Sequence, residues 1–243
     1  MSSLRQKACL AAMGVDIWVR RAREPDSMTP PRAPRTSVAR EQEPVSAATP
    51  VPTQPLLDWE TLATRVADCR ACELHEGRTQ TVFGTGSRSA EWLVIGEAPG
   101  AEEDKRGEPF VGRAGQLLTS MLGAAGLPRP QVYIANILKC RPPSNRDPKP
   151  EEVTSCEPYL FNQIALLKPR IILAVGRIAA QNLLKTQTPI GKLRGQRHAF
   201  GPEEIPVVVT YHPAYLLRSP GEKRRAWEDL LFARQVYESL PAR

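Results

Sequence analysis

The sequence predicts an α/β protein, a three-layer α/β/α sandwich around a four-stranded parallel central sheet. Two observations support this prediction. Four short apolar runs rich in valine and isoleucine occur after residue 90, and longer segments of helical periodicity alternate with them. Runs that are apolar on both sides indicate strands covered on both faces, which is typical of parallel sheets. The chain of 243 residues is long enough for one such domain plus additional segments.

The elements follow one another regularly from Asp58 onwards. Asp58 is expected to cap a first helix that carries Leu62, Val66 and Cys69. The predicted strands are residues 92–95, 132–137, 171–175 and 206–210. The predicted later helices are residues 115–123, 150–167, 178–184 and 222–240.

The first 55 residues differ in composition from the rest of the chain. Residues 25–55 contain eight prolines and few large apolar side chains, which predicts a disordered or extended linker. Before this linker, apolar residues recur at helical spacing: Leu4, Ala8, Ala11, Val15 and Trp18. We therefore expect an N-terminal segment over 1–55 and a globular domain over 56–243.

Charge and hydropathy limit the classes of function. The formal net charge of +7 and the pI of about 9.4 are compatible with an acidic partner, although charge alone does not identify one. No stretch reaches the roughly 20 apolar residues of a membrane span, and no secretory signal is recognisable. We expect no membrane partner and a reducing cytoplasm, where cysteines bind metals in preference to forming disulfides.

The spacing of four of the five cysteines is compatible with a metal site and equally with buried cysteines that bind nothing. Cys69 and Cys72 are spaced as a CxxC pair, Cys140 follows the second predicted strand, and Cys156 falls within a predicted helix. The first helix could bring the pair close to the other two. Four thiolates suit either zinc or an iron–sulfur cluster, and the spacing leaves both open. Cys9 is expected to be unligated.

A glycine-rich loop follows the first predicted strand. It begins with Gly96-Glu-Ala-Pro-Gly100 and continues to Pro109-Phe-Val-Gly-Arg-Ala-Gly115. Open α/β sheets bind ligands at the carboxyl ends of their strands. Glycines let the backbone approach a ligand closely, while Glu97 offers a polar group and Phe110 a stacking surface. We interpret this loop as part of an active site.

Several separated motifs occur together in one order. They are Cys69-x-x-Cys72, Gly96-Glu-Ala-Pro-Gly100, Pro109-Phe-Val-Gly-Arg-Ala-Gly115, Asn136-Ile-Leu-Lys-Cys-Arg-Pro-Pro143, Cys156 and His212-Pro-Ala-Tyr-Leu-Leu-Arg218. Together they closely resemble the family 4 uracil-DNA glycosylases, the iron–sulfur-containing branch of that superfamily. The resemblance covers about residues 58–240 and implies the uracil-DNA glycosylase fold for this domain.

The resemblance implies hydrolysis of the bond between uracil and deoxyribose, which leaves an abasic site for base-excision repair. It implies that Glu97 positions or activates the attacking water and that His212 stabilises the charge on the leaving uracil. The implied substrate-binding residues are Ala98, Glu103, Phe110 and Asn136. Among these, Phe110 would stack on a flipped base, and the Asn136 amide would pair with uracil O4 and N3–H.

The resemblance also implies contacts with DNA. Leu216, Leu217 and Arg218, together with Tyr215, would enter the minor groove and fill the space left by the flipped base. Two basic groups are expected to contact phosphates: Lys139, Arg141, Arg146 and Lys149, and Arg218, Lys223, Arg224 and Arg225. The acidic side chains of Glu102 and Asp104 are expected to be solvated.

The resemblance further implies a [4Fe-4S] cluster held by Cys69, Cys72, Cys140 and Cys156. One related branch traps uracil-DNA covalently through a histidine in a basic insertion near the third cysteine. Residues 140–147 contain no histidine, which favours turnover over trapping. No lysine occupies a matched nucleophile position, so we expect no strand cleavage through a Schiff base.

The expected enzyme is thus a monofunctional glycosylase. It would act as a monomer on uracil in single- and double-stranded DNA, in the bacterial cytosol or nucleoid. Two alternatives come from other classes. One is a binding module that senses damaged bases without turnover, and the other is a zinc-stabilised α/β hydrolase that acts on nucleotides.

Overall fold

The structure is a computed structural model that describes residues 57–241. The predicted N-terminal helical segment, the proline-rich linker and Cys9 lie outside the described residues. In the part that is described, no helix combines the length and the apolar character that a membrane crossing requires.

A mixed sheet forms the centre of the described domain, with six strands in the order β1-β3-β2-β4-β6-β5. Its four inner strands match the predicted ones and are mutually parallel: β3 (Val132–Asn136), β2 (Trp92–Gly96), β4 (Ile171–Val175) and β6 (Ile205–Thr210). The predicted count of four was too low, because two antiparallel edge strands complete the sheet: β1 (Thr85–Gly86) and β5 (Arg197–Phe200).

The five predicted helices are all present, with small shifts at some ends, but Cys69 lies past the end of the first helix and not on it as predicted. They are α2 (Trp59–Ala67), α5 (Arg113–Ala124), α6 (Pro150–Leu167), α7 (Arg177–Leu183) and α10 (Lys223–Glu238). Asp58 caps α2 as predicted, because its carboxylate accepts a hydrogen bond from the backbone N of Thr61 at 2.8 Å. Short helices lie between them: α3 (Leu74–Gly77), α4 (Ala101–Arg106), α8 (Ile190–Leu193) and α9 (Pro213–Arg218). The single turns of 3-10 helix are η1 (Arg129–Gln131), η2 (Pro143–Asn145) and η3 (Pro220–Glu222).

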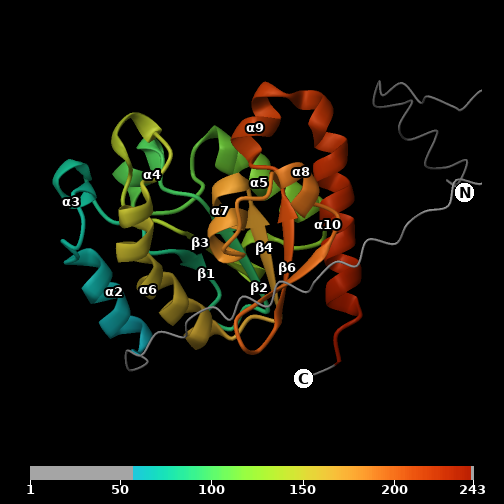
Figure 1. The fold of residues 1–243 in the computed structure, drawn as a ribbon, viewed down its shortest axis with the longest axis horizontal. Helices are drawn as coiled ribbons and strands as arrows, with labels where there is room; N and C mark the ends of the chain where they lie inside the picture. Colours follow the sequence, from blue (N-terminus) through green and yellow to red (C-terminus); the bar gives the residue numbers. More distant parts are fainter. Residues whose placement is uncertain (1–56, 242–243) are drawn as a thin grey trace, which may run out of the picture. The chain divides into compact units, whose positions relative to one another are not determined.

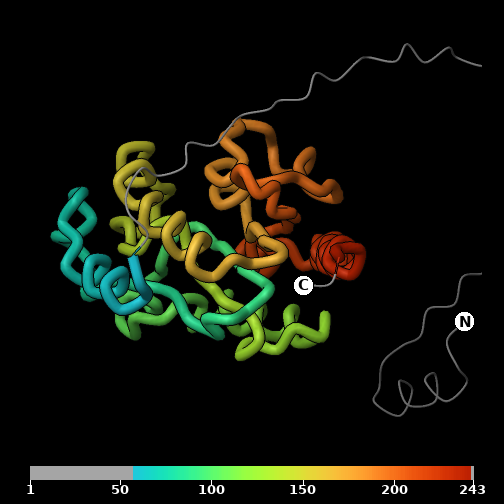
Figure 2. Tube along the Cα trace, turned by 90° about the horizontal axis from the view of Figure 1, so that it is seen from below, coloured from blue at the N-terminus to red at the C-terminus, as the bar shows by residue number. Residues whose placement is uncertain are grey.

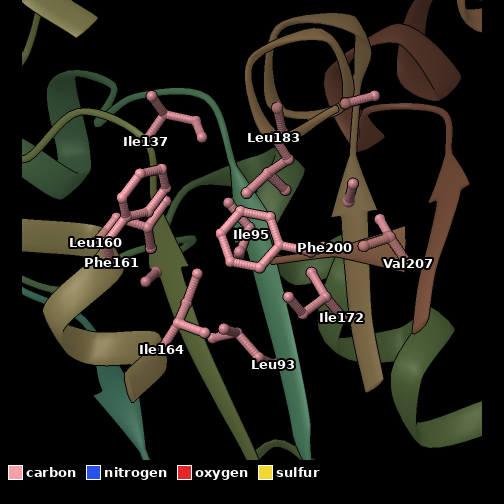
Figure 3. Packing of buried hydrophobic residues seen from close by; sticks show 14 of the residues in the cluster. Leu93, Ile95, Ile137, Leu160, Phe161, Ile164, Ile172, Leu183, Phe200 and Val207 are labelled. Carbon is pink, nitrogen blue, oxygen red and sulfur yellow. The ribbon is translucent and has the colours of Figure 1, made fainter. Parts of the chain in front are cut away.

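Two apolar cores lie on the opposite faces of the sheet, because successive side chains of a strand point to opposite sides. Leu93 and Ile95 of β2 belong to the core under α6 and α7, where they pack with Leu160 and its neighbours (Figure 3). Trp92 and Val94 of the same strand belong to the core under α5 and α10. Figure 1 and Figure 2 show α6 and α5 on opposite sides of the sheet, which confirms the three layers.

The connections that leave β2 and β4 run to opposite faces of the sheet. The chain after β2 leads into α5, whereas the chain after β4 leads into α7. Adjacent strands whose connections diverge in this way open a crevice at their carboxyl ends. In Figure 1 the arrows of β4 and β6 point to the end of the sheet where α4 and α9 lie. The glycine-rich loop therefore begins at the place where this topology favours a ligand site.

Candidate active site and cysteine site

A cavity of about 770 Å³ opens beyond the carboxyl ends of the parallel strands. The loops after β2, β3, β4 and β6 all contribute to its wall. The residues predicted for catalysis and substrate binding line it together: Glu97, Ala98, Glu103, Phe110, Asn136 and His212. A cleft of this size is large enough for a small organic ligand such as a nucleoside.

Glu97 is the first residue after β2 and is partly buried. Burial, with a smaller contribution from the carboxylate of Asp147, raises the pKa of Glu97 to about 7, and the guanidinium of Arg177 opposes this rise. Asp147 and Arg177 form an ion pair and also line the cavity. A carboxyl group with a pKa near neutrality is well matched to accept a proton from water.

Phe110 is buried and has an unusual backbone conformation. Its φ of 55° lies in the left-handed region, which costs a non-glycine residue roughly 1–2 kcal/mol. Arg129 holds the strained segment, because its guanidinium donates to the carbonyl of Phe110 at 3.1 Å and to that of Pro109. The Phe110 ring lies 5.7 Å from the His212 ring. A Cβ on Gly96 would come within 2.5 Å of the Phe110 ring. Strain of this kind is found at functional sites when the surroundings enforce it.

Glu103 joins the two halves of the glycine-rich loop. Its carboxylate accepts hydrogen bonds from the backbone N of Gly100 at 3.1 Å and from those of Val111 and Gly112 at 3.0 Å. The segment that carries Phe110 is thereby fixed to the start of α4. Glu103 therefore shapes the cavity wall through backbone hydrogen bonds.

Asn136 ends β3 and is only 2% exposed. Its Oδ1 is buried and finds no hydrogen-bond partner within the described residues. It lies beside Phe110, since a Cβ on Gly96 would contact both side chains at 2.5 Å. An unsatisfied buried acceptor costs about 1–3 kcal/mol, so a donor from a ligand would relieve this cost.

His212 caps the N-terminus of α9. Its Nδ1 accepts a hydrogen bond from the backbone N of Ala214 at 3.2 Å. Burial, aided by the charge of Arg218, lowers the pKa of His212 to about 4, against a weaker effect of Glu103. The ring is therefore neutral at pH 7, and because Nδ1 accepts, the proton resides on Nε2. A neutral donor is thus available to an oxygen atom in the cavity.

The predicted DNA-contacting residues lie on α9, but they do not all face solvent. Leu217 is 39% exposed, and Tyr215 is 37% exposed. Arg218 is exposed and lines the cavity. The rings of Tyr215 and Tyr211 lie 5.1 Å apart at the cavity wall. Leu216, in contrast, is completely buried and has no surface to offer to DNA.

Two expectations of solvent exposure were wrong. Asp104 is buried and accepts hydrogen bonds from the backbone N and the Oγ1 of Thr79 at 3.0 and 2.7 Å. Lys139 is 1% exposed, and its Nζ donates to the carbonyl of Asn136 and to Gln163. Lys139 is therefore excluded as a phosphate contact in this conformation.

The four predicted cysteine ligands converge on a second cavity, which they line together: Cys69, Cys72, Cys140 and Cys156. Two follow the end of α2, one follows β3 and one lies in α6. Donors point at their sulfur atoms. The Arg78 Nη1 lies 3.1 Å from the Cys140 Sγ, and the backbone N of Lys139 lies 3.2 Å from the Cys156 Sγ. Such donors around sulfur are typical of thiolate ligands.

The chemistry of these thiols and their spacing bear on the kind of metal site. Burial raises the pKa of Cys140 and raises that of Cys156 to about 12, so a metal would have to displace their protons. Over residues 57–241, no group of three or more His, Cys, Asp or Glu side chains could hold a single metal ion. The four cysteines nevertheless line one cavity.

Comparisons with known proteins decide the family. The model of the uracil DNA glycosylase superfamily matches residues 83–231. The chain is 46% identical over 166 residues to a type-4 uracil-DNA glycosylase of Archaeoglobus fulgidus, covering 65% of this chain and 83% of that protein. The chain is a type-4 member of the uracil-DNA glycosylase superfamily. A type-4 uracil-DNA glycosylase of Thermotoga maritima is 44% identical over 169 residues, covering 68% of this chain and 86% of that protein. A type-5 uracil-DNA glycosylase of Thermus thermophilus is 37% identical over 118 residues, which cover 42% of this chain and 53% of that protein. The predicted family and enzyme class are confirmed.

The sequence interpretation missed several residues of this uracil-DNA glycosylase cavity, including Asp147, Arg177 and Tyr211. Arg177 follows the carboxyl end of β4, so the rule that pointed to Glu97 would also have found it. Tyr211 directly precedes His212. Asp147 lies in an exposed loop, and its place beside Glu97 has no signal in the sequence.

Proposed function

We propose that the cavity hydrolyses the N-glycosidic bond of uracil in single- and double-stranded DNA by base flipping and leaves an abasic site. Membership of the family makes the chain a uracil-DNA glycosylase. The residue roles proposed here rest on one observation, which is that Glu97, Phe110, Asn136 and His212 line the same cavity.

Base recognition is assigned to Phe110 and Asn136. A base inside a duplex is out of reach, so the nucleotide must be flipped into the cavity, where the Phe110 ring replaces part of the lost stacking. The unpaired Oδ1 of Asn136 is suited to accept the N3–H of uracil, and its amide N–H groups can donate to O4. Cytosine has an unprotonated N3 and an amino group at C4. Its N3 acceptor would therefore face the amide oxygen, and its amino donor would face the amide N–H groups. Polar pockets discriminate strongly against ligands that leave their buried groups unpaired.

The chemical step is assigned to Glu97 and His212. When the bond between N1 and C1′ breaks, its electron pair moves onto uracil, and the negative charge is shared with O2. The neutral His212 can donate its Nε2–H to that oxygen. Glu97 accepts a proton from water as the water oxygen bonds to C1′, which yields an abasic sugar and the uracil anion. Glu97 then releases its proton, and the uracil anion takes up a proton at N1 to give free uracil. No lysine occurs among the described residues that line the cavity, in agreement with a monofunctional glycosylase.

Contact with DNA is assigned to the exposed side chains of α9. Tyr215 and Leu217 are available to fill the space left by the flipped nucleotide, and Arg218 is available to a phosphate. The buried Leu216 anchors the helix to the domain instead of entering the groove. The proposed DNA-binding set is therefore Tyr215, Leu217 and Arg218.

The four cysteines are proposed to hold a [4Fe-4S] cluster. The four cysteines line one cavity, and the resemblance to the iron–sulfur-containing family 4 enzymes favours the cluster over zinc. The cluster would supply a link between α2, the segment after β3 and α6, and no step of the reaction depends on it.

The remaining parts of the proposal concern the organisation of the chain. We place the catalytic domain in residues 56–243, after an N-terminal segment over 1–55. The superfamily match starts at residue 83, well after that segment. We propose a monomer that acts in the bacterial cytosol or nucleoid.

The proposed function is tested by excision from a uracil-containing oligonucleotide, single-stranded or paired, with alkali to cut the abasic sites. The expected result is cleavage at uracil and none at thymine, with several turnovers when DNA exceeds enzyme. Glu97→Ala should remove most of the activity. Glu102 is an exposed carboxylate of α4, so Glu102→Ala should leave the activity unchanged. Binding of uracil-DNA without release of uracil would instead support a sensor of damaged bases.

A further inference from the structure

Lys139 is a fully buried cation whose described partners are all neutral. It lies between Asn136 and Cys140 in the segment after β3, and it is 1% exposed. Its Nζ donates to the carbonyl oxygen of Asn136 at 2.9 Å and to the Oε1 of Gln163 at 2.7 Å. In the described range, no carboxylate forms an ion pair with it. Removing an unpaired charge from water is strongly unfavourable, so a compensating negative charge is expected nearby.

The four-cysteine cavity, which Lys139 adjoins, is a source of negative charge when its cysteines are thiolates. Lys139 lines this cavity, and its backbone N donates to the Cys156 Sγ at 3.2 Å. Cysteines that bind a metal do so as thiolates, and charges interact strongly in a buried environment of low dielectric constant. The ammonium of Lys139 would thus balance part of the charge of the thiolates.

Lys139 also contacts Asn136, the residue proposed to recognise the base. The Asn136 side chain has an unpaired Oδ1, so its orientation depends on how the end of β3 is held. The Nζ of Lys139 holds the backbone carbonyl of that residue. Gln163 anchors the lysine in turn, because its Nε2 donates to the carbonyl of Phe83 at 2.9 Å.

We propose that Lys139 is a positioning residue that acts as the buried counter-charge of the four-cysteine site and holds Asn136 in the orientation that reads uracil. The inference rests on the proposed roles of Asn136 and the cysteines. It assigns one side chain to two sites that otherwise lie in separate cavities. It also explains why a lysine in a basic segment is kept away from solvent and DNA.

The charge part of the inference is tested by iron retention in the full-length protein without DNA. Lys139→Met and Lys139→Gln remove the charge, whereas Lys139→Arg keeps it. The first two should lose iron and visible absorbance several-fold faster in the presence of a chelator, and Lys139→Arg should remain close to the wild type. Lys149→Met is the control, because Lys149 is an exposed lysine paired with Glu73 next to Cys72. Equal loss in all three Lys139 variants would show a packing effect and overturn the inference, as would retention in all three.

The positioning part is tested by inhibition with free uracil, measured on protein that still holds its iron. In Lys139→Met, or in Lys139→Gln if the former does not fold, the inhibition constant should rise about tenfold, the worth of roughly one hydrogen bond. The KM for uracil-DNA should rise more than kcat falls. An unchanged inhibition constant would refute the link to Asn136. A wild-type protein that excises no uracil would refute the proposed function instead, while the iron measurement would still test the charge.

Discussion

At the scale of single residues, the proposed role of Glu97 predicts that its protonation state controls the pH dependence of the reaction. Its pKa is about 7, so the carboxylate that accepts the proton is present above neutrality and lost below it. Activity limited by this group therefore rises with pH through about 7. Asp147 contributes to the raised pKa by like-charge repulsion, and Arg177 acts in the opposite direction.

Replacing Asp147 by Asn should move the acid limb of kcat/KM to lower pH. The change removes the negative charge near Glu97 and leaves the positive charge of Arg177 without its ion-pair partner, so both effects lower the pKa of Glu97. The measurement is the pH profile of single-turnover excision. Glu228→Gln, which removes an exposed carboxylate on α10, should leave the profile in place. A limb that moves to higher pH in Asp147→Asn would contradict the assignment to Glu97.

His212→Ala should slow excision by a factor of the order of 10²–10³, the usual loss when one donor to a developing oxyanion is removed. The low pKa of His212 adds a second expectation. The ring stays neutral above about pH 5, so its ionisation should leave no limb in the profile near pH 6.5. Single-turnover rates measured from pH 5 to 8 test both points. Unchanged rates in the variant would remove His212 from the mechanism.

The site residues differ in how far the sequence could predict them. Glu97 directly follows β2, Asn136 ends β3 and His212 lies two residues after β6, so their place at one edge of a parallel sheet could be predicted from the pattern. The burial of Lys139 and Leu216 could not. Lys139 is buried because Gln163 of α6 receives its Nζ, and such contacts between distant segments leave no mark on local periodicity.

At the scale of elements, α9 presents its side chains in a definite way. Its six residues begin at the His212 cap, and the buried Pro213 and Leu216 fix it to the domain. Tyr215 is left at the surface, where its ring lies against Tyr211. Tyr211 is itself held by the guanidinium of Arg194, which lies 4.1 Å from the ring centre. The helix thus joins the histidine of the site to a supported aromatic surface at the cavity wall.

Tyr215→Ala should lower kcat/KM on double-stranded uracil-DNA by about tenfold or more, because stacking of a base on an aromatic ring is worth roughly 1–3 kcal/mol. The loss should be smaller on single-stranded DNA, which has no opposite strand to leave a gap when the base flips. The comparison of the two substrates is the measurement. Trp227→Ala is a matched control, because Trp227 on α10 is 38% exposed, close to the 37% of Tyr215. Equal losses in both variants would argue against a specific role of α9.

The elements that the sequence failed to predict are short or exposed. β1 has two residues, α3 and α8 have four each, and β5 is largely exposed. None of them is long enough or apolar enough to give a periodic signal. The inner strands and long helices could be predicted because each buries a regular apolar pattern. The two antiparallel edges, set by pairing with β3 and β6, could not.

At the scale of the whole molecule, the four-cysteine site connects segments that the sheet alone does not join. Cys69 and Cys72 follow α2, and α2 otherwise packs against α6 on one side of the domain. Cys140 follows β3, directly after the segment that holds Asn136. A cluster bound by all four thiolates would therefore tie the N-terminal end of the domain to the base-reading strand. Loss of the cluster would therefore destabilise the whole domain.

Cys140→Ser should give colourless protein that folds poorly, because it removes one thiolate and leaves three buried or partly buried cysteines without their shared metal site. The measurements are iron content, visible absorbance and thermal unfolding of the full-length chain. Ser155 is half-exposed and lines the same cavity. The control variant Ser155→Ala should therefore keep its iron and its stability. A brown, stable and active Cys140→Ser variant would rule out the four-cysteine cluster. A colourless variant that melts earlier but still releases uracil slowly would place the cluster in the stability of the domain, apart from the chemistry at Glu97 and His212.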